Sequence, residues 1–187
     1  MGWNLWFLDR ANIRFSWGCR LKKIFNFSHT YSKLPPFFYQ KIKPQPVKNP
    51  KLIEFNLELS KFLNINSNDI DKKVGGLIFS GNHLPDGAQP IAMAYAGHQF
   101  GNFVPQLGDG RAILIGELIA SNGKRFDIQL KGSGQTPYSR NGDGKATLGP
   151  MIREYIVSEA MNYLGIPSTR ALAIIITGEK ILREKYE

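Results

Sequence analysis

Two short glycine-rich segments with nearly the same residue order are the strongest candidates for chemistry in this sequence. Residues 108–112 read Gly-Asp-Gly-Arg-Ala, and residues 142–146 read Gly-Asp-Gly-Lys-Ala. Glycines let backbone N–H groups turn inward to form an anion-binding nest, and the Arg or Lys that follows adds positive charge. Between the two segments, the extended run Asp127–Lys131 ends in a lysine. This arrangement predicts a polyphosphate site and therefore favours nucleotide binding.

Each of these residues also has an ordinary structural interpretation. Lys131 alone would be a solvent-facing strand lysine, and Glu154 an acid on a helix surface. Asp109 and Asp143 are residue types that form turns. His98, which lies between Gly and Gln before the first glycine segment, is interpreted as a buried structural hydrogen-bonding residue and not as a catalytic one.

Composition limits the classes of protein that the chain can represent. Its 187 residues, 42% hydrophobic and 21% charged, are enough for one globular domain. The net charge of +9 is uneven, because residues 1–50 hold nine Lys/Arg and one acid, whereas residues 51–187 hold fifteen Lys/Arg and fourteen Asp/Glu. A nearly neutral body predicts no nucleic-acid partner. With one cysteine, three scattered histidines and no long apolar run, we expect no internal disulfide, zinc site or membrane span.

Residues 1–24 form a basic, aromatic extension. Five Lys/Arg and three Trp occur there with a single acid, which is typical of an organelle-targeting or membrane-surface helix. A nonessential extension is the alternative that we favour. The rest divides into residues 25–102, an N-terminal arm and helical segment, and residues 103–187, which are rich in strand patterns.

The first half of the chain contains few clear elements. Five prolines in Leu34–Pro50 predict an extended arm. The apolar spacing in Leu52–Leu63 predicts a helix. We expect a polar loop over Asn68–Lys73 and a short helix over Ile91–Gln99.

The pattern becomes clearer after residue 102. Strands are expected over Phe103–Leu107, Arg111–Ala120 and Phe126–Lys131, and the Asn-Gly pair at residues 122–123 predicts a hairpin between the last two. A long glycine-rich loop follows over residues 132–149.

A helix is predicted next, with Pro150 in its first turn and Gly165 just beyond its end. Glu154 lies off the apolar stripe of this helix. The stripe consists of Ile152, Tyr155, Ile156, Ala160 and Tyr163 or Leu164. Strands are expected at Ala171–Thr177 and from Ile181 onward.

This order of elements is that of the smaller, N-terminal lobe of a protein kinase, an α+β fold built on an antiparallel sheet. In that lobe a glycine loop covers the nucleotide, a strand lysine contacts phosphates, and a helix glutamate holds the lysine by an ion pair. Lys131 and Glu154 occupy the corresponding places in the order.

Long contiguous segments of this chain closely resemble the SelO/YdiU family, and the resemblance runs from about Phe25 to the end. The matching segments are Tyr95–Gly101 (YAGHQFG), Gln106–Ala112 (QLGDGRA), Asp127–Arg140 (DIQLKGSGQTPYSR), Asn141–Ala146, Arg153-Glu154 and Ser158–Met161. Residues 1–24 carry no such resemblance.

The resemblance implies a kinase-like fold that transfers AMP from ATP to Ser, Thr or Tyr hydroxyls of protein substrates. It also implies a set of site residues. Those implied to bind the nucleotide are Gly108, Gly110, Arg111, Lys131, Asp143 and Gly144, with Glu154 as the ion-pair partner of Lys131.

The family's catalytic Asp, its ligands for Mg²⁺ or Mn²⁺ and two further arginines are expected downstream of this sequence. No catalytic or metal-binding residue is therefore assigned here. We expect an N-terminal fragment that transfers no AMP alone. The alternatives are a non-catalytic ATP-binding remnant and a split-gene half that needs a separately encoded C-terminal lobe as its partner. The resemblance implies a cytoplasmic location for a bacterial source and allows a mitochondrial one for a eukaryotic source.

Overall fold

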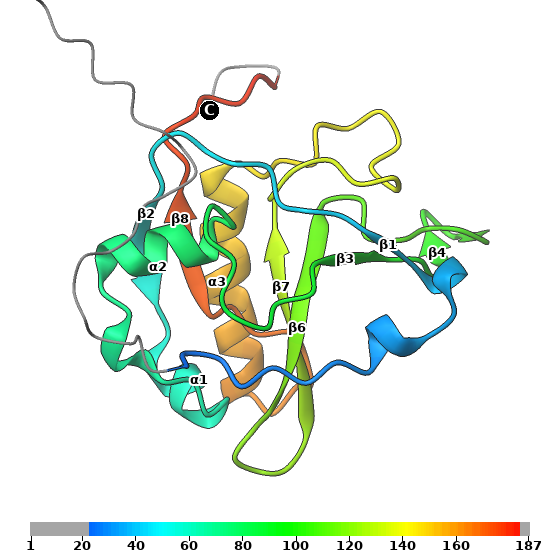
Figure 1. Cartoon of the computed structure of the whole chain (residues 1–187). Coiled ribbons are helices and arrows are strands. Elements are labelled where there is room, and N and C mark those ends of the chain that lie inside the picture. The colour runs from blue at the N-terminus through cyan, green and yellow to red at the C-terminus, as the bar shows by residue number, and fades with distance from the viewer. Residues whose placement is uncertain (1–22, 184–187) are drawn as a thin grey trace, which may run out of the picture.

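The computed structural model describes residues 23–183 as a mixed α+β structure (Figure 1). Antiparallel sheets and few helices make up these residues, which confirms the predicted α+β class. Nearly all of the predicted extension at residues 1–24, including Cys19, lies outside the described residues.

The largest sheet has four strands in the order β1-β3-β6-β7. They are β1 (Tyr39–Lys41), β3 (Ile91–Met93), β6 (Ala112–Ile119) and β7 (Arg125–Lys131), and every neighbouring pair is antiparallel. Gly123, with φ at +77°, turns the chain between β6 and β7. The hairpin predicted from Asn-Gly is therefore present, because glycine adopts this left-handed conformation without steric cost.

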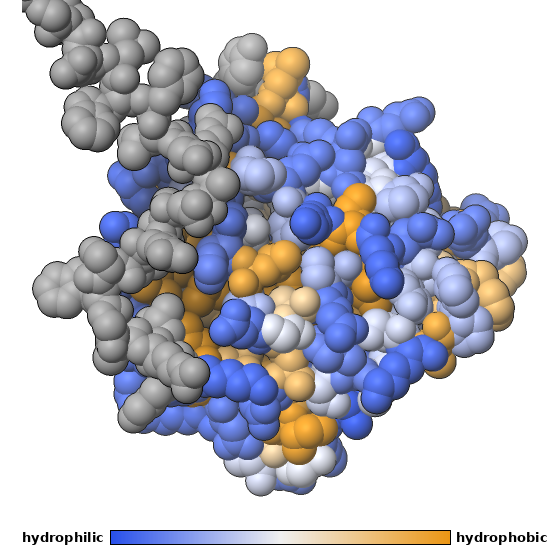
Figure 2. All heavy atoms as spheres, in the orientation of Figure 1, coloured by the Kyte–Doolittle hydropathy of each residue, from blue (hydrophilic) through white to orange (hydrophobic). Residues whose placement is uncertain are grey.

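The core lies mainly on β6 and β7, and the face drawn in Figure 2 is mostly polar, with apolar side chains visible between the polar ones. Six consecutive residues of β6, from residue 113 to 118, are buried, whereas β7 alternates between buried Ile128 and Leu130 and exposed neighbours. The same core takes in Phe25 near the start of the described chain and Leu59 and Ile78 from two short helices. These helices are α1 (Leu57–Phe62) and α2 (Lys72–Phe79).

A second sheet of two strands overturns one of the helix predictions. Strand β2 (Lys51–Phe55) pairs with β8 (Ala173–Ile176), so the first part of the helix predicted over Leu52–Leu63 is a strand. The helix α1 begins only after Asn56, whose side chain accepts a hydrogen bond from Leu59 N. The distant partner strand overrides local helical spacing here.

The predictions for two other segments were also wrong. Ile91–Gln99 contains β3 and then β4 (Gly97–Gln99), which forms a hairpin with β5 (Asn102–Val104). The polar stretch Asn68–Lys73 overlaps the 3-10 turn η3 (Ser67–Asp69) and the start of α2. Asp71 caps α2 by accepting from the backbone N–H groups of Lys73 and Val74.

The N-terminal arm crosses the sheet and is fastened to it by a buried carboxylate. After two 3-10 turns, η1 (Tyr31–Lys33) and η2 (Pro36–Phe38), the arm enters β1. Glu117 of β6 is 3% exposed and accepts hydrogen bonds from the Thr30 hydroxyl and from the Thr30 and Tyr31 backbone N–H groups. Burial opposes ionisation of Glu117, but these bonds, together with Arg125, outweigh it and lower the pKa.

The long helix α3 (Leu148–Tyr163) lies beside β7 and β8 (Figure 1). It ends as predicted, because Gly165 adopts φ +73° just beyond the cap residue Leu164. Its apolar stripe does not face the core: Ile156 is 61% exposed and Tyr163 is 72% exposed. The stripe is thus an exposed surface of the described residues.

Candidate functional site

An open cavity of about 700 Å³ lies between the first glycine segment and the loop that follows β7. Five of the seven predicted site residues line it: Gly108, Gly110, Arg111, Asp143 and Gly144. The structure therefore brings the two glycine segments together around one space, although 34 positions separate their matching residues. Lys131 and Glu154 lie outside this lining.

The first glycine segment packs tightly on the loop after β7. A Cβ atom on Gly108, which has φ +68°, would lie 2.4 Å from the Tyr138 ring, and one on Gly110 would lie 2.9 Å from the Tyr138 carbonyl oxygen. The Ser139 hydroxyl donates to the Gly110 carbonyl. Any larger residue would push the two walls apart, so the glycines are needed for close packing of the cavity walls.

Asp109, interpreted from sequence as a turn residue, also fastens the glycine segment to β3. Its backbone N–H donates to the Met93 carbonyl at 2.9 Å, and its carboxylate accepts from Met93 N at 3.0 Å. The Thr136 hydroxyl donates to the Asp109 carbonyl at 2.6 Å. The side chain is 5% exposed, and burial raises its pKa. Nothing in the sequence spacing indicated this anchoring role.

Lys131 and Glu154 form an ion pair that joins β7 to α3. Lys131 Nζ lies 2.7 Å from Glu154 Oε1 and 2.6 Å from Glu154 Oε2. Lys131 is the last residue of β7 and is paired with Ala112, immediately after Arg111. The N–H of the next residue, Gly132, donates to the Arg111 carbonyl at 2.7 Å. The lysine thus stands next to the end of the first glycine segment.

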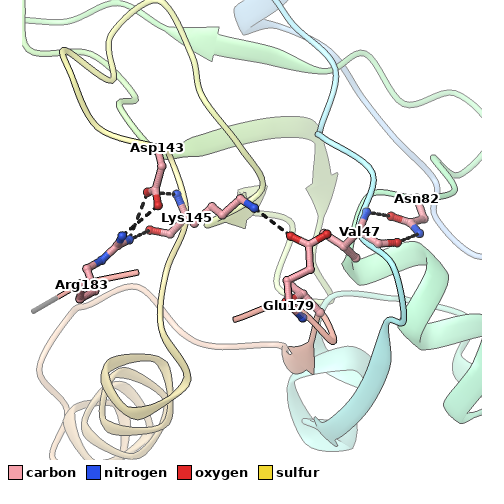
Figure 3. Close-up of polar contacts among 7 residues, drawn as sticks. Val47, Asn82, Asp143, Lys145, Glu179 and Arg183 are labelled. Carbon is pink, nitrogen blue, oxygen red and sulfur yellow. Dashed lines mark hydrogen bonds and ion pairs between the residues drawn. The ribbon is translucent and has the colours of Figure 1, made fainter. Parts of the chain in front are cut away.

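The second glycine segment is held by charges from the end of the described chain (Figure 3). Arg183 donates to both carboxylate oxygens of Asp143, at 2.9 and 3.1 Å, and this contact holds the pKa of Asp143 below its usual range. Gly144 has φ +67°, and a Cβ atom there would lie 2.0 Å from the Gly134 carbonyl oxygen. Lys145 Nζ pairs with Glu179 at 2.8 Å.

Positive charge predominates around the cavity. Arg111, Arg140, Lys145 and Arg183 line it, and Asp143 is the one carboxylate among the described lining residues. Such a ring of cations around backbone turns is suited to a polyanion. Two of these cations also make contacts within the protein: Arg140 donates to Gln99 at 2.8 Å, and Lys145 pairs with Glu179.

Sequence reasoning missed Arg183 and Tyr138 as parts of the cavity wall. Arg183 is 40 positions beyond Asp143, and no local spacing connects the two. The interpretation of His98 as a buried hydrogen-bonding residue was wrong. His98 is exposed on β4, with its ring centroid 5.5 Å from that of Phe103.

The described residues offer no ready metal centre. Within residues 23–183, no group of three or more His, Cys, Asp and Glu side chains is placed to hold a metal ion. Asp143, the carboxylate in the cavity, is already occupied by Arg183. The same part of the chain contains no helix both long and apolar enough to span a bilayer.

Comparison with known proteins identifies the family of this chain. Residues 22–186 match the sequence model of a family described as "Protein adenylyltransferase SelO". The chain belongs to the SelO family. Curated relatives named protein nucleotidyltransferase YdiU include one from Roseobacter denitrificans, 59% identical over 158 residues, and one from Anoxybacillus flavithermus, 57% identical over 159 residues.

These SelO relatives are much longer than this chain. The aligned regions cover 84% and 85% of the chain but only 33% of each relative. The chain thus spans about a third of the length of the relatives it matches. The activity of a whole SelO protein is therefore only proposed for this chain.

Proposed function

We propose that this chain is the nucleotide-binding part of a SelO-type protein adenylyltransferase. The activity is the transfer of AMP from ATP to Ser, Thr or Tyr hydroxyls of protein substrates. The observation that carries the proposal is the cation-lined cavity between the two glycine segments, in a chain of this family.

The fold proposed for this part is a kinase-like N-terminal lobe. Three observations support it: the antiparallel hairpin β6–β7, the glycine segment directly before β6, and the ion pair between Lys131 and Glu154. In kinases the same lysine–glutamate pair accompanies the nucleotide-competent arrangement of the lobe. Lys131 is therefore assigned to the nucleotide phosphates and Glu154 to holding it in place.

The charges of the site suit AMP transfer. Attack of a substrate hydroxyl oxygen on the α-phosphorus forms the new P–O bond and breaks the bond to the β-phosphate, so that pyrophosphate leaves. The hydroxyl proton passes to the catalytic carboxylate expected downstream of this sequence. Negative charge then grows on the β- and γ-phosphates. Arg111 and Lys131 are assigned to neutralise that leaving group, while Gly108, Gly110, Asp143 and Gly144 shape the nucleotide pocket.

A divalent metal ion, Mg²⁺ or Mn²⁺, is expected in full-length members, but the described residues do not fit one. The nearest carboxylate, Asp143, is neutralised by Arg183, and no group of metal-ligand side chains accompanies it. We therefore propose that the chain alone binds ATP without transferring AMP, because residues 23–183 do not supply the remaining catalytic groups.

One alternative is a split-gene half, and the exposed stripe of α3 is then a suitable surface for a separately encoded C-terminal lobe. Ile152, Ile156, Tyr163 and Leu164 are between 38% and 74% exposed, whereas the stripe of such a helix is normally covered. The other alternative is a non-catalytic ATP-binding remnant.

Label transfer from ATP radiolabelled at the α-phosphate separates these interpretations. The purified chain is tested alone, and then together with a polypeptide corresponding to the remaining part of the Roseobacter denitrificans relative. We expect ATP binding without labelling from the chain alone. Labelled protein in the mixture would favour the split-gene alternative. Labelling by the chain alone would overturn the proposed inactivity of this chain. Binding without labelling in either sample would favour the remnant.

A further inference from the structure

Two ion pairs fasten the segment after β8 onto the second glycine segment (Figure 3). Arg183 donates from Nη1 to Asp143 Oδ2 at 2.9 Å and from Nη2 to Asp143 Oδ1 at 3.1 Å. Lys145 Nζ lies 2.8 Å from Glu179 Oε2. The two pairs stand on either side of Gly144, so they hold its backbone from both directions.

Further hydrogen bonds fix the orientation of the Asp143 carboxylate. Lys145 N donates to Asp143 Oδ1 at 2.9 Å, and Arg183 Nη2 also donates to the Lys145 carbonyl at 3.3 Å. The Arg183 guanidinium therefore donates hydrogen bonds to both Asp143 and Lys145, the two residues that flank Gly144. A planar fork of donors suits this two-point contact, which a lysine ammonium would not reproduce.

The segment that carries Arg183 is itself anchored. Ile181, two residues earlier, is 8% exposed, and the Thr177 carbonyl accepts from Asn49 N at 3.0 Å. The arm before Asn49 is fixed in turn, because the Asn82 side chain bonds both the N–H and the carbonyl of Val47 at 2.8 Å (Figure 3). These hydrogen bonds thus anchor the chain that leads to Arg183 and the cavity.

The ion pair between Arg183 and Asp143 contributes little to folding stability. The side chains of Arg183 and Asp143 are 39% and 43% exposed, and ion pairs so accessible to water contribute little to stability. Both residues line the cavity. An unpaired carboxylate there would repel a polyanion, and an adjacent guanidinium offsets its charge.

We propose that Arg183 is a positioning residue of the nucleotide site: it orients Asp143 and neutralises it, so that the phosphates of ATP can enter the cavity. The inference rests on the proposed nucleotide-binding function. It adds a residue outside both glycine segments to the set on which ATP affinity depends.

A double-mutant cycle with the full chain tests this role. ATP affinity is measured for the wild type, Arg183→Met, Asp143→Asn and the double variant, and Arg183→Lys tests whether charge alone suffices. Lys124→Met, at the exposed hairpin tip, is the matched control for losing one positive charge. We expect Arg183→Met to weaken ATP binding about tenfold, but less than about twofold when Asp143 is already Asn.

A second measurement needs no nucleotide. The titration of the Asp143 carboxyl, followed by NMR, should shift to higher pH in Arg183→Met and move back toward the wild-type value in Arg183→Lys. An unchanged titration would overturn the pairing on which the inference depends. The carboxyl titration also detects Arg183→Met protein that fails to fold, because the spectrum would then lose its dispersion.

The outcomes separate this inference from the proposed function. A wild type that binds ATP, with Arg183→Met binding equally well, overturns the role of Arg183 alone. Equal losses for Arg183→Met in both backgrounds would also overturn it, because Arg183 would then act independently of Asp143. A wild type that does not bind ATP overturns the proposed nucleotide site, and the role of Arg183 with it.

Discussion

Lys131 Nζ lies 2.6 Å from Glu154 Oε2, and this contact joins the last residue of β7 to the second turn of α3. The side chains remain 39% and 42% exposed, so water screens the attraction and its contribution to folding is about 1 kcal/mol or less. The main effect of the pair is to fix the direction of a lysine that would otherwise sample many rotamers. The Lys131 backbone pairs with Ala112, next to the first glycine segment.

Replacing Glu154 by Gln should therefore affect ligand binding more than stability. We expect the midpoint of thermal unfolding to change by only a few degrees, since about 1 kcal/mol corresponds to a few degrees in a domain of this size. ATP affinity should fall severalfold because Lys131 loses its orientation. Asp86→Asn, an exposed carboxylate elsewhere, serves as the control. A large loss of stability with unchanged ATP affinity would contradict this account.

We expect the attachment of the N-terminal arm to be sensitive to acid, because the Glu117 carboxylate holds it. Its pKa is lowered in the folded state, so its stabilising effect is complete above the ordinary glutamate pKa, about 4.3. That effect is lost as the pH falls through the lowered value. Glu117→Gln should cost about 1 to 3 kcal/mol at neutral pH and flatten the dependence of the unfolding free energy on pH below about 4.3. Denaturant titrations at several pH values measure both the loss at neutral pH and the pH dependence. If the unfolding free energy of the variant fell equally steeply with pH, Glu117 would not be the source of the acid sensitivity.

Gly144 should tolerate no side chain. An added Cβ would lie 2.0 Å from the Gly134 carbonyl oxygen, at a backbone φ of +67°. We expect Gly144→Ala to lower the unfolding free energy by about 1 to 3 kcal/mol and to weaken ATP binding. Gly149→Ala is the matched control, because a Cβ at Gly149 meets nothing within 4 Å. Equal behaviour of the two variants in denaturant unfolding would argue against this backbone packing.

Because the apolar stripe of α3 is exposed, we expect it to tolerate polar substitutions. Replacing Ile156, at 61% exposure, by Glu should change the unfolding free energy, measured by denaturant titration, by no more than about 0.5 kcal/mol. By contrast, Ile113→Ala in the buried centre of β6 should cost about 2 to 5 kcal/mol. A comparable loss for Ile156→Glu would mean that the stripe is covered in the isolated chain.

Local signals predicted the parts of the fold that local chemistry determines. The Asn-Gly pair before Lys124 gave the β6–β7 hairpin, and Gly165 marked the end of α3. The strand β2 could not be predicted in this way, because Lys51–Phe55 is held by β8 far along the chain. Similarly, the apolar stripe of α3 indicated a helix correctly, but spacing alone does not say which neighbour covers each face.

The same distinction applies to the candidate site. The two glycine segments were visible in sequence because each combines a turn with a nearby cation. Arg183 was not, because its relationship to Asp143 exists only after β8 returns the chain to the cavity. The anchoring of Asp109 to Met93 was missed for the same reason.

ATP affinity of the purified full chain, compared between the wild type and Lys131→Met, tests the central claim most directly. Lys124→Met controls for the loss of one charge. The account predicts saturable ATP binding by the wild type and by Lys124→Met, and at least about tenfold weaker binding by Lys131→Met, since a charge-assisted contact to phosphate contributes about 1.5 to 3 kcal/mol. Equal ATP affinity in all three proteins, or no binding by the wild type, would contradict it.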